Sequence, residues 1–240
     1  MPFPASWYSV ELRGYRDHPE QYRTYSPFLF ESLPPLPNEL FDGNFSWLPL
    51  TRDLVPTGKS RFEWAYPPVL KRMAEESEEL QITIPPEFVR FMASVDFPNR
   101  IRSATDCAFD LAEKLVYVPW ETGYLLRFLA DSQGSLFWYL FLRQGGGHCV
   151  VVAGFPPYGG DPTADREFME KHLGPDWNRE DPPKESDGIW FCAPSFENFI
   201  YRFWIENEIW YALSETGGPV SNDQQRYLMH YRNASVQAKR

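Results

Sequence analysis

From residue 114 onward, apolar residues come in short runs that turn residues separate. The runs are KLVYVP, GYLLRFLAD, SLFWYLFLR and HCVVVAG, and GIWFCA follows further along the chain. DSQG and QGGG lie between the later runs, and their glycines accept the positive φ of tight hairpin turns. This pattern predicts an antiparallel sheet of locally connected strands over residues 115–193.

The 3.6-residue period predicts helices on either side of these runs. VLKRMAEESEEL (69–80) has an apolar face and outward glutamates, and ITIPPEFVRFMASV offers Pro86 as the first residue of a second helix, so 69–95 reads as two helices. Ser195 is the expected N-cap of a long helix, SFENFIYRFWIENEIWYALSE, with an aromatic stripe that faces the core. QQRYLMHYR is expected to form one more short helix before a frayed end.

Residues 1–68 form a different kind of segment. They contain 11 of the 23 prolines together with many aromatic rings. Proline at this density excludes long helices and central strands, while so many rings exclude a solvated linker. We predict an irregular extension packed on the core, with SWYSVELRGY as a strand and FESLPPLPNEL as loop. Residues 69–240 are then the main domain, and the fold class is α+β.

Charge limits the choice of partners. The formal net charge is −10, and half of it comes from residues 155–188, an acidic insertion rich in Pro and Gly. A chain without a basic stripe is not expected to bind nucleic acid. The insertion fits two interpretations, a solvated loop that aids solubility or a docking element for a basic protein surface.

Cysteines and targeting signals indicate a reducing compartment. The three cysteines are widely spaced, without a Cys-x-x-Cys pair, so neither a disulfide framework nor a zinc site is predicted. The first residues do not resemble a signal peptide, and no apolar stretch reaches membrane-spanning length. We expect a cytoplasmic protein with no metal, no cofactor and no contact with a membrane.

The strand within SLFWYLFLR has apolar residues on both faces. Alternation puts Leu136, Trp138, Leu140 and Leu142 on one face and Phe137, Tyr139 and Phe141 on the other. In one interpretation this is a central strand, with helices on one side and the proline-rich extension on the other.

In the alternative interpretation, part of the ring surface lines a groove for a protein partner. Tyr and Trp suit such a surface, because each joins a large rigid contact area to a polar tip. The candidates are Trp120, Trp138 and Tyr139, bordered by a polar rim at Glu121, Asp131 and Gln133. Ordinary turn chemistry would equally explain the last two.

GGGHCV suggests an enzyme alternative in which His148 or Cys149 acts as a nucleophile or ligand. Neighbouring residues of a strand point to opposite faces, which weakens that pairing. A pair assembled from distant positions, such as Cys192 with His148, stays open. This alternative predicts a pocket between the sheet and the extension, near these residues and Glu121.

The order of these elements resembles the SUKH superfamily. The resemblance is carried by ITIPPEFVRFM, RFLADSQGSLFWYLFL, HCVVVAG and APSFENFIYRFWIE, and it covers residues 69–213. DFPNRIRS stands where that family usually has an Asn-Gly stretch. The resemblance implies a mostly antiparallel sheet packed against helices, and protein binding in place of catalysis.

Many SUKH proteins resemble intracellular immunity proteins, which neutralise bacterial toxins by direct contact. We therefore expect a non-enzymatic binding module, an immunity protein that occludes a toxin, which would itself be basic if the acidic charge contributes to docking. A small-ligand binder or enzyme is the alternative, and a regulatory scaffold without a toxin is a third.

Overall fold

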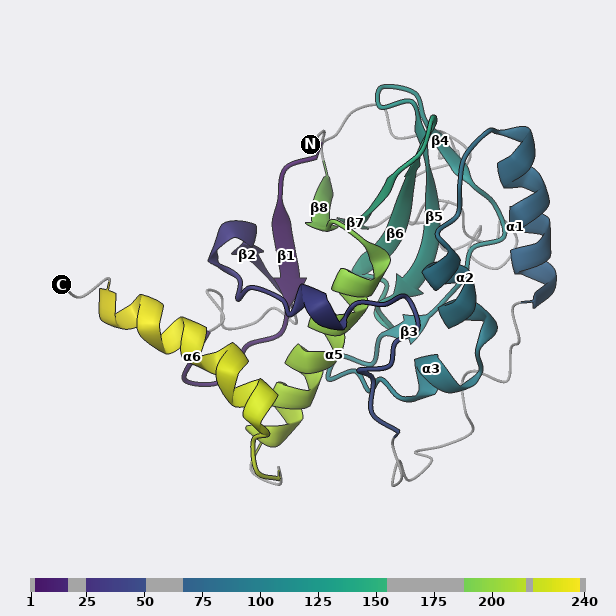
Figure 1. Cartoon of the computed structure of the whole chain (residues 1–240). Coiled ribbons are helices and arrows are strands. Elements are labelled where there is room, and N and C mark those ends of the chain that lie inside the picture. Colours follow the sequence, from purple (N-terminus) through teal and green to yellow (C-terminus); the bar gives the residue numbers. More distant parts are fainter. Residues whose placement is uncertain (1–2, 17–24, 51–66, 155–187, 215–217, 238–240) are drawn as a thin grey trace.

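The computed structural model describes residues 3–16, 25–50, 67–154, 188–214 and 218–237. Within these ranges the chain has an α+β fold, in which a mostly antiparallel sheet packs against helices (Figure 1). The predicted fold class is confirmed. Nearly all of the acidic insertion predicted at 155–188 lies outside the described residues.

The main sheet is antiparallel throughout its described strands, as the runs predicted. The order is β3-β5-β6-β7-β8, and β4 pairs with β5 beside β3. Its strands are β3 (Ala108–Phe109), β4 (Val116–Val118), β5 (Gly123–Ala130), β6 (Leu136–Arg143), β7 (His148–Gly154) and β8 (Ile189–Ala193). Only β3 was not predicted, because two residues are too few to show a period.

The two predicted hairpin turns join β5 to β6 and β6 to β7. Gly134 donates its N–H to Asp131 O at 2.9 Å in the first, and Gly146 donates to Arg143 O at 3.1 Å in the second. Both glycines have positive φ, at 69° and 105° respectively. Asp131 N also donates to Leu136 O at 3.0 Å, so the DSQG turn closes the hairpin tightly.

The helices agree with the predicted order. They are α1 (Pro67–Glu79), α2 (Pro86–Ala93), the short α3 (Asp96–Asn99), α5 (Phe196–Ala212) and α6 (Asn222–Gln237). Ser195 caps α5 as predicted, since its Oγ accepts from Asn198 N at 3.2 Å. α6 is longer than predicted. Its capping box explains where it begins: Ser221 and Gln224 bond each other's backbone N–H.

The N-terminal segment adds a second, two-stranded sheet. β1 (Ser6–Ser9) pairs antiparallel with β2 (Ser26–Leu29), and β1 lies beside β8 (Figure 1). Phe191 of β8 donates its N–H to Pro4 O at 2.8 Å. The predicted strand is thus shorter than SWYSVELRGY. The predicted loop FESLPPLPNEL contains two short 3-10 turns, Phe30–Ser32 and Asn38–Leu40.

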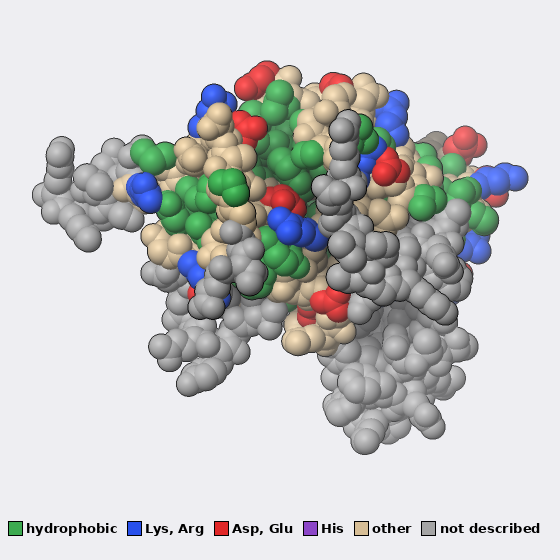
Figure 2. Space-filling view, turned by 90° about the horizontal axis from the view of Figure 1, so that it is seen from below, with side chains coloured by type: hydrophobic (Ala, Val, Ile, Leu, Met, Phe, Trp, Pro, Cys, Tyr) green, Lys and Arg blue, Asp and Glu red, His purple; other side chains and the backbone are tan. Residues whose placement is uncertain are grey.

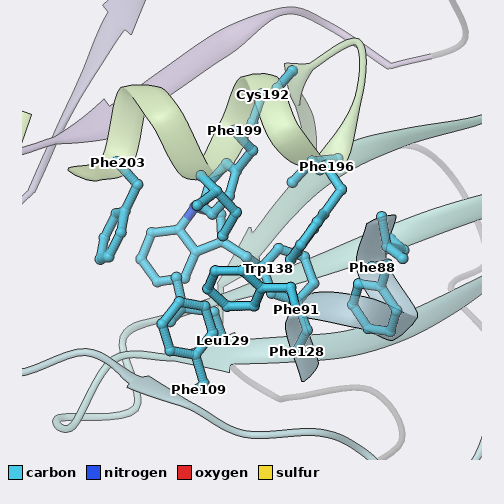
Figure 3. Packing of buried hydrophobic residues seen from close by; sticks show 14 of the residues in the cluster. Phe88, Phe91, Phe109, Phe128, Leu129, Trp138, Cys192, Phe196, Phe199 and Phe203 are labelled. Carbon is cyan, nitrogen blue, oxygen red and sulfur yellow. The ribbon is translucent and has the colours of Figure 1, made fainter. Parts of the chain in front are cut away.

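β6 has a core on each face, with the division that alternation predicted. Leu136, Trp138, Leu140 and Leu142 belong to the cluster beneath α2 and α5. Phe137, Tyr139 and Phe141 belong to the cluster on the other face. In Figure 3 the rings of Trp138, Phe199 and Phe203 meet between the sheet and α5. β6 is therefore a central strand, as the first interpretation predicted, and the helices cover one of its faces.

The described part of the extension packs mainly on the helical side of the sheet. Trp7, Tyr25 and Phe45 are buried there, and Phe45 lies 5.1 Å from the Phe91 ring between α2 and α5. On the opposite face the described extension contributes Phe3 and Phe30. The expectation that the extension covers mainly that second face is wrong for the described residues, because the chain after β2 returns past α5.

α5 is buried on its second side as well. There Tyr201, Ile205 and Ile209 pack against α6 and against Leu12 of the N-terminal segment. A helix that is apolar over so much of its circumference belongs in the middle of a layered body. Figure 1 shows α5 between the sheet and α6.

A buried carboxylate joins these three elements. Glu206 of α5 is 0% exposed and accepts hydrogen bonds from Trp7 Nε1 at 2.8 Å and from Ser9 Oγ. Arg16 reaches both of its oxygens at 2.7 Å, and Tyr227 OH of α6 donates at 2.5 Å. A buried charge is tolerated only when paired and hydrogen-bonded in this way.

Among the described residues, no helix combines the length and the apolar character needed to cross a lipid bilayer.

Candidate functional site

Two of the predicted partner-binding residues lie in the core. Trp138 is 1% exposed and Tyr139 is 0% exposed, one on each face of β6. The prediction that these two rings face a partner is wrong, because a side chain without accessible surface cannot contact a partner. Their large apolar rings, which suggested a recognition surface, stabilise the two core layers instead.

The predicted polar rim does not form, because β5 separates its members. Trp120 and Glu121 precede this strand, whereas Asp131 and Gln133 follow it, and its 8 residues span about 25 Å. Asp131 is buried, and its carboxylate accepts from Tyr25 OH at 3.0 Å and Ser135 N at 3.2 Å. The position of Asp131 is therefore explained by its hydrogen bonds within and beside the turn, which was the alternative interpretation. Gln133 is exposed at the same turn.

Trp120 and Glu121 remain at the surface, in the turn that joins β4 to β5. Trp120 is half-buried and packs edge-on against Phe3 with ring centroids 5.4 Å apart. Glu121 N donates to Val118 O at 3.2 Å, which closes a β-turn. Glu121 is half-buried and follows Trp120 directly in this turn.

An exposed pair of tyrosines on β4 and β5 extends this end of the sheet. Tyr117 and Tyr124 are direct cross-strand partners, with ring centroids 5.2 Å apart. Tyr117 is 42% exposed and Tyr124 is half-buried. We call Tyr117, Trp120, Glu121 and Tyr124 the β4–β5 corner, which wraps around the end of the sheet: Tyr124 packs against the cluster on the helical face and Trp120 against the cluster on the other face. Sequence reasoning missed the tyrosine pair, although residues 117 and 124 are equidistant from a four-residue turn at 119–122.

Carboxylates of α1 lie next to the corner. Burial raises the pKa of Tyr124, and the charges of Tyr117 and Glu76 raise it further, which places Glu76 close to the tyrosine pair. Burial is also the largest influence on the pKa of Glu76, which is raised even though Arg72 and Lys114 act to lower it. Desolvation, with the charge of Glu79, thus outweighs the effect of these two cations on Glu76.

Further glutamates lie in the C-terminal half of α1, where the helix dipole makes negative charge least favourable. Glu75, Glu76, Glu78 and Glu79 occupy that half, and the last turn has no basic residue. The helix dipole disfavours negative charge at a C-terminus by roughly 0.3–1 kcal/mol per group. A local rule broken in this way is typical of functional sites.

The backbone of the corner is held in an uncommon conformation. Thr122 has φ 51°, which is a true outlier for a β-branched residue, and its carbonyl accepts from Gln144 N at 3.1 Å. Next to it, Gly123 lies so close to the Phe141 ring that a Cβ would approach it to 2.5 Å. Tight packing below and a hydrogen bond beside it therefore fix the corner.

The underside of the molecule has a different character. In Figure 2 the described part of that face mixes Lys or Arg with Asp or Glu side chains among hydrophobic ones. Such a mixture is typical of an ordinary soluble surface. The β4–β5 corner and the adjacent end of α1 combine partly exposed rings with a local excess of glutamates over the nearby cations Arg72 and Lys114.

The two cysteines of the enzyme alternative lie on opposite faces of the sheet. Cys149 lies in the core on the second face and Cys192 in the core beneath the helices. Burial raises the pKa of Cys149 to about 11 and that of Cys192 well above its ordinary value. Both are therefore neutral thiols at pH 7, and a neutral thiol is a poor nucleophile.

Two pockets lined by described residues lie elsewhere. One, of about 290 Å³, lies between Tyr15 and α6, and the other, of about 250 Å³, lies at the ends of α5 and α6. Neither is lined by His148, Cys149, Cys192 or Glu121. Within the described ranges, no three His, Cys, Asp or Glu side chains come together in a way that could hold a metal ion.

We compared the chain with models of protein families, with curated proteins and with solved structures. None of the three comparisons gives a match.

Proposed function

We propose that this chain is a non-enzymatic protein-binding module that binds a basic surface of its partner at the β4–β5 corner. The observation that carries the proposal is the partly exposed Tyr117–Tyr124 pair beside the half-buried carboxylate of Glu76. Tyrosines are enriched at binding hot spots because they offer rigid apolar area with a polar tip. A cation from the partner would complete the charge of Glu76 and favour its ionised form.

In the role that the SUKH resemblance implies, the chain is a cytoplasmic immunity protein. It would neutralise a toxin by covering the toxin's active cleft or substrate groove, with no chemical step of its own. Useful protection requires nanomolar affinity, about −12 kcal/mol. Opposite charge alone does not reach this value, so ring anchors such as Tyr117 and Trp120 have to supply most of it.

The test is affinity capture from the native cell with the full chain, followed by mass spectrometry. Wild type, Tyr117→Ala and Glu121→Ala are compared with Leu29→Ala, a control whose side chain is 74% exposed on β2, outside the corner. We expect one basic protein to be captured by wild type and Leu29→Ala. Tyr117→Ala is expected to weaken its binding by about 2 kcal/mol, near 30-fold.

The same experiment can contradict the proposal. Capture of no protein, under conditions that retain known tight complexes, would count against a binding module. Equal capture by all four proteins would leave binding intact but would exclude the β4–β5 corner as its site.

A further inference from the structure

One ring nitrogen at the edge of the core has two partners that it cannot bind at the same time. His148 begins β7, and its Nε2 lies 3.4 Å from the backbone N–H of Phe196 and 3.5 Å from Oε1 of Glu87. The first contact requires a lone pair on Nε2, while the second requires a proton there. The protonation of one atom therefore selects which element His148 binds.

These two partners belong to different helices. Phe196 is the first residue of α5, and Glu87 lies in the first turn of α2. α2 and α5 are in contact with each other, and His148 lies beneath both at the end of the sheet. Its side chain is 19% exposed and that of Glu87 is 20% exposed, so both can exchange protons with solvent.

Among the described residues, the neighbours of His148 on β6 and at the start of α5 are apolar or already engaged. On β6 its cross-strand partner is Leu142, an apolar residue. On α5, the carboxylate of Glu197 accepts from Gly43 N and Trp47 Nε1, both at 2.8 Å. Glu87 is the charged group that acts on His148, and it favours the protonated ring.

We infer that His148 is a proton-dependent link between the sheet and its two covering helices. The neutral ring accepts the N-terminal N–H of α5, and the protonated ring turns to the carboxylate on α2. The positive end of the α5 dipole disfavours the charged ring at the first position. This link is independent of any partner protein, so its failure would leave the proposed function untouched.

Burial lowers the pKa of His148, and Glu87 opposes that effect in part. The unfolded chain, with a His pKa of about 6.5, then binds a proton before the folded chain does. The contribution of His148 to stability is complete above about pH 6.5. It declines as pH falls toward the pKa that His148 has in the folded chain. Mild acid is thus expected to release the start of α5.

NMR titration of the assigned full chain between pH 5 and 8 tests this inference. His148→Gln identifies the His148 ring signal, and the backbone amide of Phe196 is followed in the same samples. We expect the Phe196 amide to shift with the midpoint of His148 and to stop titrating in His148→Gln. Glu87→Gln should lower the midpoint by about one unit, because the protonated ring loses its carboxylate.

Glu113→Gln is the matched control, since Glu113 pairs with Arg72 at the surface, away from His148. It should leave the midpoint unchanged. A Phe196 amide that does not follow His148, or a midpoint indifferent to Glu87→Gln, would overturn the inference.

Discussion

At the scale of single residues, the C-terminal cap of α1 contains a residue type that is unfavourable at its position. Gln81 has φ 55°, a left-handed conformation that glycine adopts most readily. Ile82 N donates to Ser77 O at 3.0 Å and Gln81 N to Glu78 O at 3.2 Å. These two bonds are the Schellman motif, in which glycine is the usual residue at the position of Gln81.

Gln81→Gly should therefore stabilise the protein by about 1 kcal/mol. The relief of left-handed strain exceeds the entropy that the added glycine loses on folding. Gln225→Gly, in the interior of α6, is the matched control and should destabilise by about 1 kcal/mol. Thermal unfolding of both variants measures the sign, and a lower melting temperature for Gln81→Gly would contradict the strain argument.

At the scale of elements, α5 owes its central position to contacts on both sides. Toward the sheet it presents Phe199 and Phe203, which surround Trp138. Toward the N-terminal segment and α6 it presents Glu206 and Arg202. Arg202 donates to Tyr227 OH at 2.7 Å and to Pro34 O at 2.9 Å.

Trp138→Ala should cost about 3–5 kcal/mol, because it leaves a cavity between β6 and α5. Leu29→Ala removes an exposed side chain and should change stability by no more than about 0.5 kcal/mol. Denaturant unfolding compares the two. An unchanged midpoint for Trp138→Ala would mean that this ring is not part of the core.

Glu206→Gln should cost about 3–5 kcal/mol at pH 7, since it leaves Arg16 buried without its carboxylate. Burial by itself would raise the pKa of Glu206, but the charges and hydrogen bonds of Arg16, with Arg202 and Ser9, lower it from 4.5 to about 2. As pH falls, the Glu206 carboxyl therefore binds a proton in the unfolded chain before it does so in the folded chain. Stability from Glu206 is present above pH 4.5 and is lost progressively as pH falls toward 2.

Melting temperatures measured from pH 7 down to pH 3 test whether the stability due to Glu206 falls as pH falls. Wild type should lose stability below about pH 4.5, and Glu206→Gln should start lower and lose less. Glu208→Gln breaks a partly exposed pair with Arg102 and should cost only about 0–1 kcal/mol. Parallel pH curves for wild type and Glu206→Gln would contradict the role of this carboxylate.

Across the whole molecule, the helices and strands could be predicted because the sequence patterns that indicate them are local. The hairpins follow from glycine turns between apolar runs, and the α5 cap follows from Ser195 before an aromatic stripe. The faces of β6 also followed from alternation alone. What alternation could not decide was whether Trp138 and Tyr139 face a core or a partner, because ring type suits both.

The parts that could not be predicted depend on contacts between distant residues. Glu206 reads as a solvent-facing position of an amphipathic helix until Arg16, 190 residues earlier, is brought against it. The Tyr117–Tyr124 pair requires the register of β4 on β5, which only the length of the turn at 119–122 encodes. Glu121 and Asp131 were grouped by residue type, although β5 holds them apart.

The proposed binding surface is the β4–β5 corner together with the acidic end of α1. Hydrogen–deuterium exchange of the full chain, alone and with its captured partner, locates the bound surface directly. We expect slowed exchange within residues 76–81 and 116–124, with α6 unchanged. Protection confined to α6 or to the β1–β2 sheet, with residues 116–124 exchanging as before, would contradict the account.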